Sequence, residues 1–154
     1  MIKPIVISDP YPRTLDLIFT KTKLKELKTK YKIIVAPKNN KKNLYENNIG
    51  KATFIIGQPN LDKYLLSKAS KLKCIINVES NFMDNLDYDY CFKKNIHVIA
   101  TSPVFSKPVA EIALGMTLSL LRNIHNAHFD FIKSKEKYGL ESNLQASLLT
   151  NKKI

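Results

Sequence analysis

Five short apolar runs, rich in isoleucine and valine, constrain the fold of this chain more than any other feature. They are Ile5–Ser8, Lys32–Ala36, Thr53–Gly57, Lys73–Val78 and His97–Ala100. Each run is nearly continuous rather than alternating, which is typical of parallel strands that are covered on both faces. Segments with helical spacing of apolar residues lie between them. This alternation predicts an α/β fold, with a flavodoxin-like parallel sheet domain over residues 1 to about 100.

The predicted helices follow from where the helical spacing begins and ends. They are one or two helices over Thr14–Lys30, a short helix or loop over Asn39–Asn48, Leu61–Lys71 with Asn60 as N-cap, and Leu86–Lys94 capped by Asp84 or Asn85. A long helix is predicted to start near Pro108, with Ser106 as its N-cap and one apolar stripe that ends at Ile124. After Asn123 the pattern loosens, which predicts an extended arm with short helices.

The net charge of +12 raises the question of a nucleic-acid partner, because basic surfaces attract phosphate. The charge is nearly all lysine, however, and the only arginines are Arg13 and Arg122. Since arginine is the usual residue for bidentate phosphate and base contacts, lysines spread among asparagines indicate solvated faces. A binding module for anions, nucleic acid or a protein partner stays open as an alternative function.

The apolar runs and the cysteines of the sequence bear on the cellular location and on metal binding. No apolar run approaches the roughly 20 residues of a membrane helix, and Ile112–Leu121 is interrupted by polar residues and glycine. The N-terminal apolar run ends at Pro10, too early for a signal peptide, so we expect a cytoplasmic protein without a membrane partner. Cys74 and Cys91 form no C-x-x-C pair, and we expect no metal site.

Polar residues follow the predicted strands, at the edge where open α/β sheets bind ligands. Gln58 follows the third strand, and Glu79-Ser80-Asn81-Phe82 follows the fourth. Backbone N–H groups in such a turn can hold a carboxylate, although an ordinary capped turn explains the same residues.

Several short motifs in fixed order resemble the D-isomer-specific 2-hydroxyacid dehydrogenases. That family has a G-x-G-x-D-N-I-D-like turn, then G-I-x-V-x-N-x-P, then V-A-E at the head of a long helix that ends in a basic residue. The counterparts here are Ser80–Asp87, Asn95–Val98 with Thr101–Pro103, Val109–Glu111, and Leu121–Arg122. The family's two turn glycines are replaced by Ser80 and Phe82, and Glu79 adds a negative charge where an anion would bind.

The resemblance implies a two-domain, NAD-dependent oxidoreductase that acts on the CH–OH group of a 2-hydroxy acid, with a 2-keto acid as product. Residues 1–101 would be the substrate (catalytic) domain. Residues 102–154 would be the linking helix, a dimerisation arm and the start of an incomplete Rossmann domain. Asn81 would face the substrate and the nicotinamide, with Ser80 and Gln58 as further candidates, and the full-length protein would be a homodimer.

The same resemblance implies that the chain lacks the catalytic machinery. The family's G-x-G-x-x-G loop and its catalytic Arg, Glu and His come after the position of Ile154. NAD, or NADP, would therefore be bound mainly by residues missing from this chain, and the isolated chain would be an inactive fragment or truncated product. We expect DNA beyond codon 154 to encode G-x-G-x-x-G within about ten residues.

Overall fold

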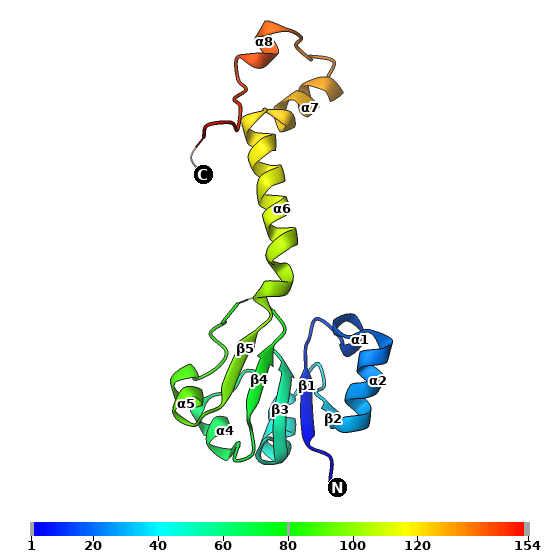
Figure 1. The fold of residues 1–154 in the computed structure, drawn as a ribbon, viewed down its shortest axis with the longest axis vertical. Helices are drawn as coiled ribbons and strands as arrows, with labels where there is room; N and C mark the ends of the chain where they lie inside the picture. Colours follow the sequence, from blue (N-terminus) through cyan, green and yellow to red (C-terminus); the bar gives the residue numbers. More distant parts are fainter. Residues whose placement is uncertain (1, 80, 153–154) are drawn as a thin grey trace. The chain divides into compact units, whose positions relative to one another are not determined.

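The computed structural model describes residues 2–79 and 81–152. They form two compact units, Met1–Pro103 and Val104–Ile154, which are described one at a time (Figure 1). The sequence predicted a domain boundary after residue 101; the roles assigned to its two domains stay predictions.

The first unit contains one parallel sheet. Its strands are β1 (Ile5–Asp9), β2 (Lys32–Val35), β3 (Ala52–Gly57), β4 (Cys74–Asn77) and β5 (His97–Ala100). Their spatial order is β2-β1-β3-β4-β5, and every neighbouring pair is parallel. This is the flavodoxin-like order, in which the connection direction reverses between β1 and β3. The predicted fold class is therefore confirmed, with strand ends shifted by no more than a residue.

Helices cover the two faces of this sheet. They are α1 (Leu15–Ile18), α2 (Lys21–Lys30), α3 (Lys41–Asn48) with the 3-10 turn η1 (Ile49–Lys51), α4 (Lys63–Lys68) and α5 (Tyr88–Lys93). On one face, Ile7, Ile55 and Ile75 pack in a cluster to which α3, η1, α4 and α5 contribute. On the other, Val6 and Ile56 belong to a smaller cluster that takes in apolar residues of α1 and α2. Figure 1 shows α1 and α2 beside β1 and β2, away from α4 and α5.

Two predicted helix starts are wrong for the same reason. Helix α4 is capped by Asp62 rather than Asn60, and α5 by Asp87 rather than Asp84 or Asn85. Leu61, which was predicted to be helical, instead forms a parallel bridge with Leu86. Because this pairing holds both segments extended, each helix begins only after it.

The second unit consists of α6 (Ser102–Leu121, which begins two residues before the unit boundary), α7 (Ile124–Ile132) and α8 (Leu140–Asn143). The predicted start near Pro108 is wrong, because Pro108 lies inside α6. Proline there removes a single backbone hydrogen bond, to the carbonyl of Val104. Val104 is 73% exposed, so water can hydrogen-bond to the carbonyl that lacks this partner. The predicted short helices after Asn123 are present.

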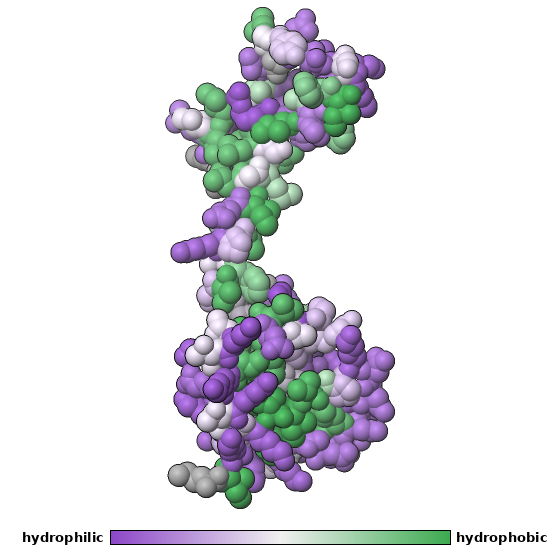
Figure 2. Space-filling model, turned by 90° about the vertical axis from the view of Figure 1, so that its right-hand side faces the viewer, coloured by the Kyte–Doolittle hydropathy of each residue, from purple (hydrophilic) through white to green (hydrophobic). Residues whose placement is uncertain are grey.

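Helix α6 has no buried residue, and large apolar side chains from Val104 to Leu120 are exposed along it. Figure 2 shows green, hydrophobic residues at many points on this unit's surface. By length and composition alone, α6 could cross a membrane, which differs from the sequence expectation. That expectation counted unbroken apolar runs, whereas a mean hydropathy tolerates Gly115, Thr117 and Ser119.

Candidate functional site

The candidate site lies where the loops after β1, β3 and β4 come together. These strands are neighbours in the sheet, so their carboxyl ends share one edge. The backbone N–H of Gln58 donates to the carbonyl of Asp9 at 2.9 Å, which joins the loop after β3 to the end of β1. Gly57 has a φ of +146°, and a Cβ atom on it would lie 1.9 Å from that carbonyl oxygen. Only glycine fits this close approach.

A buried carboxylate ends β1. Asp9 is 2% exposed, and its oxygens accept from Lys41 Nζ at 2.6 Å and from the Tyr45 hydroxyl at 2.9 Å. Burial, together with the charge and hydrogen bond of Asp9, raises the pKa of Tyr45 far above its usual value. A buried carboxylate needs such partners, and both come from α3. The cluster thus fixes α3 against the end of β1.

An ion pair connects the loop after β1 to the loop after β4, which are the strands on either side of β3. Arg13 Nε donates to Glu79 Oε1 at 2.9 Å, and Nη2 donates to Oε2 at 3.3 Å. The hydrogen bond and then the charge of Glu79 raise the pKa of Arg13. The sequence indicated only that Glu79 adds a negative charge where an anion would bind, and the structure pairs this charge with Arg13. The two residues are 66 positions apart, so no local pattern signals their pairing.

Gln58, a predicted site residue, lies between these two loops. Its Nε2 donates to the sulfur of Met83 at 3.1 Å, and thioether sulfur is a weak acceptor. Its Oε1 is buried and has no hydrogen-bond partner among the described residues. Gln58 therefore has hydrogen-bonding capacity that the described residues leave unused.

The loop after β4 is fastened to the loop after β3. Asn85 Nδ2 donates to the carbonyl of Pro59 at 2.6 Å, and the backbone N–H of Leu61 donates to the carbonyl of Asn85 at 2.9 Å. The Tyr88 hydroxyl lies within hydrogen-bond distance of Asn85 Oδ1 and the carbonyl of Met83. The Asp84–Asp87 motif thus holds two site loops together.

The other predicted site residues belong to the loop after β4. Asn81 is exposed there, and Ser80 lies outside the described residues. Phe82, which replaces a family glycine, is 61% exposed and makes an edge-to-face contact with Tyr88. Nothing in the structure tests the substrate-facing role of Asn81, Ser80 or Gln58.

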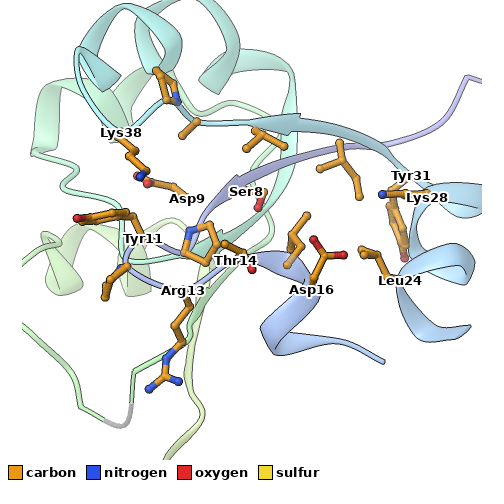
Figure 3. A pocket seen from close by; sticks show the side chains of 17 residues that line it. Ser8, Asp9, Tyr11, Arg13, Thr14, Asp16, Leu24, Lys28, Tyr31 and Lys38 are labelled. Carbon is orange, nitrogen blue, oxygen red and sulfur yellow. The ribbon is translucent and has the colours of Figure 1, made fainter. Parts of the chain in front are cut away.

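A hollow of about 770 Å³ opens beside the site, between the end of β1, helix α2 and β2. Apolar side chains from α2 and β2, including Leu24 and Ile33, line it together with Ser8, whose buried hydroxyl has no partner among the described residues. Figure 3 shows the Arg13 side chain extending out of this hollow, away from Leu24 and Tyr31. Arg13 therefore connects the hollow to the ion pair with Glu79.

The sequence of this chain contains no G-x-G-x-x-G dinucleotide motif. The turn after β1, residues 10–14, contains no glycine, and the four glycines of the sequence (Gly50, Gly57, Gly115 and Gly139) are far from the G-x-G-x-x-G spacing. Without those glycines the backbone cannot approach a pyrophosphate closely. Among residues 2–79 and 81–152, no three His, Cys, Asp or Glu side chains gather as a metal site.

Comparison with solved structures finds close matches across the chain. A phosphoglycerate oxidoreductase from Rhizobium etli is 42% identical over 96% of this chain and 45% of its own, with a TM-score of 0.68. A D-lactate dehydrogenase from Aquifex aeolicus, solved with NAD and lactic acid, is 26% identical over 89% of this chain and 39% of its own, with a TM-score of 0.58. The D-mandelate dehydrogenase of Rhodotorula graminis, 18% identical over 94% of this chain and 46% of its own, shares the fold with a TM-score of 0.71.

This chain spans less than half the length of each of these structures. No curated protein matches it. The family model for the catalytic domain of D-isomer specific 2-hydroxyacid dehydrogenases matches residues 5–147, a range that includes α6, α7 and α8 as well as the sheet. The chain therefore belongs to the D-isomer specific 2-hydroxyacid dehydrogenase family.

Proposed function

We propose that this chain is the substrate-binding part of an NAD-dependent oxidoreductase that acts on the CH–OH group of a D-2-hydroxy acid. The observation that carries the proposal is the family match over residues 5–147. The joined loops after β1, β3 and β4 support it, since they lie at the sheet edge where such folds bind ligands.

The substrate we propose is a small, anionic 2-hydroxy acid or the matching 2-keto acid. The name of the 42% identical relative, a phosphoglycerate oxidoreductase, supports a phosphorylated acid with a hydroxyl at C2. Gln58 would accept the substrate hydroxyl through its unused Oε1. Asn81 and Ser80 would face the same substrate from the loop after β4.

The cofactor we propose is NAD, with NADP as the alternative, bound by residues that this chain does not contain. We expect no turnover by the chain alone, because its sequence contains no G-x-G-x-x-G loop. We further propose a cytoplasmic homodimer that forms through the second unit. The exposed apolar side chains of α6 and α7, such as Ile112, Met116 and Phe131, support this assembly.

A chimera tests the proposed activity. Residues 1–147 of this chain would replace the matching segment of the Rhizobium etli relative, and oxidation of D-glycerate and L-glycerate with NAD would be followed by NADH absorbance. We expect turnover of the D-enantiomer, and a loss of about tenfold in kcat/KM in a Gln58→Leu chimera that lacks one hydrogen bond to the substrate.

The matched control is a Lys71→Gln chimera, because Lys71 is exposed and lies before the amino end of β4. It should keep the activity of the parent chimera. A chimera that folds and binds NADH, yet oxidises neither enantiomer nor phosphoglycerate, would contradict the proposal.

A further inference from the structure

The Arg13–Glu79 pair has the geometry with which arginine recognises anions. Two N–H groups of one guanidinium meet the two oxygens of one carboxylate, at 2.9 and 3.3 Å. The same planar fork matches the oxygens of a phosphate group. Glu79 thus occupies a position that an anionic ligand could fill in the same way.

The pair is open to exchange. The Arg13 side chain is 40% exposed and that of Glu79 is 33% exposed. Ion pairs with this much solvent contact contribute little to stability. An anion from solution can therefore replace Glu79 without separating the loops, because Asn85 joins the loop after β4 to Pro59 and the Gln58 N–H joins the loop after β3 to Asp9.

A second positive charge lies beside the loop that carries Arg13. Lys38 Nζ is 5.7 Å from the centroid of the Tyr11 ring, and Lys41 Nζ is 6.0 Å from it. Lys41 is already paired with buried Asp9 at 2.6 Å. Lys38 therefore adds positive charge beside the turn that carries Arg13. Figure 3 shows Lys38 beside Asp9 and Tyr11, while the Arg13 side chain extends away from Lys38.

Gln58 supplies the neighbouring contact for a hydroxyl. It follows β3, between the loops that carry Arg13 and Glu79. Its buried Oε1 has no partner among residues 2–79 and 81–152. A ligand hydroxyl would meet Gln58 once its amide, held by the weak contact with Met83, turns toward the ligand.

We propose that Arg13 binds the phosphate group of a phosphorylated 2-hydroxy acid, and that Glu79 pairs with the Arg13 guanidinium when no such ligand is bound. The 2-hydroxy acid part of this inference rests on the proposed function. The phosphate part rests on the ion pair itself and is tested without catalysis.

The test uses the full chain with 15N-labelled arginine. Because the chain has only Arg13 and Arg122, its Nε spectrum holds two signals, which an Arg122→Gln variant assigns. Inorganic phosphate is titrated at neutral pH and constant ionic strength. We expect the Arg13 signal to shift and saturate while that of Arg122 stays in place. In Glu79→Gln the dissociation constant should fall about two- to fivefold, because the competing carboxylate is gone.

Two further variants complete the test. Glu141→Gln removes the same charge from the second unit and should leave the dissociation constant unchanged. In the uniformly 15N-labelled chain, Arg13→Gln should abolish any phosphate-dependent shift of the Gln58 backbone amide. A purely structural ion pair predicts the opposite for Glu79→Gln, since loosening the loop would weaken any binding.

The inference is overturned if the Arg13 signal moves no more than that of Arg122, or if Glu79→Gln leaves phosphate binding unchanged or weaker. If the chimera oxidises D-glycerate but phosphate does not shift the Arg13 signal, this inference is wrong and the proposed function stands. If phosphate binds at Arg13 but the chimera folds and is inactive, the proposed function is wrong and this inference stands.

Discussion

Replacing Gly57 by alanine should damage the first unit more than any other single methyl addition at its glycines. The new Cβ would lie 1.9 Å from the carbonyl oxygen of Asp9 and 2.1 Å from its carbonyl carbon. Both atoms are backbone at the end of the interior strand β1, so neither can rotate away. The φ of +146° adds strain of about 1–3 kcal/mol, and overpacking adds about 1–3 kcal/mol.

The expected loss in the free energy of unfolding is therefore about 4 kcal/mol, a large part of the roughly 5–15 kcal/mol of a typical domain. At roughly 2–4 °C per kcal/mol, the thermal midpoint should fall by about 10 °C. Urea unfolding followed by far-UV circular dichroism measures the first quantity, and a thermal melt measures the second.

Gly50→Ala is the matched control in the same unit. Its Cβ would lie 3.1 Å from the carbonyl oxygen of Lys68, and its φ is not in the left-handed region. A shift of a few tenths of an ångström accommodates it, so we expect a loss of about 1 kcal/mol. If Gly57→Ala unfolds within about 0.5 kcal/mol of the parent chain, β1 and β3 do not approach as described.

Four other measurements test the packing and the exposed surface. Tyr45→Phe removes a hydrogen bond to the buried carboxylate of Asp9 and should cost about 2 kcal/mol in urea unfolding. Because the pKa of Tyr45 is raised in the folded state, its stability contribution is complete below about pH 10 and is lost above it; unfolding midpoints that are unchanged by alkali would contradict this. Burial raises the pKa of the Cys74 and Cys91 thiols, so a thiol reagent should label them near neutral pH only after unfolding. The exposed apolar surface of α6 should make the chain self-associate in sedimentation, and a well-behaved monomer would count against that.

Much of the fold could be predicted because it depends on local sequence. The isoleucine- and valine-rich runs located every strand, and their spacing indicated parallel pairing. The helix starts failed where a distant contact decided them. Leu61 pairs with Leu86, 25 positions away, and this contact sets where α4 and α5 begin. Pro108 looked like a helix start but lies inside α6, because losing one exposed hydrogen bond does not end a helix of 20 residues.

The candidate site was predictable only in outline. The strand ends indicated which loops meet, and Gln58 was named for that reason. The partner of Glu79 was missed, since nothing near it in sequence points to Arg13. The partners of Asp9 were missed as well, because α3 supplies them from more than 30 positions away.

The sequence by itself determined the α/β class, the parallel sheet and the family, because these depend on apolar periodicity and on short motifs in fixed order. Only the tertiary structure decided the charges of the site. Electrostatic pairing depends on distance in space, and folding brings Arg13 to Glu79 and Lys41 to Asp9 across strands that the chain visits in a different order.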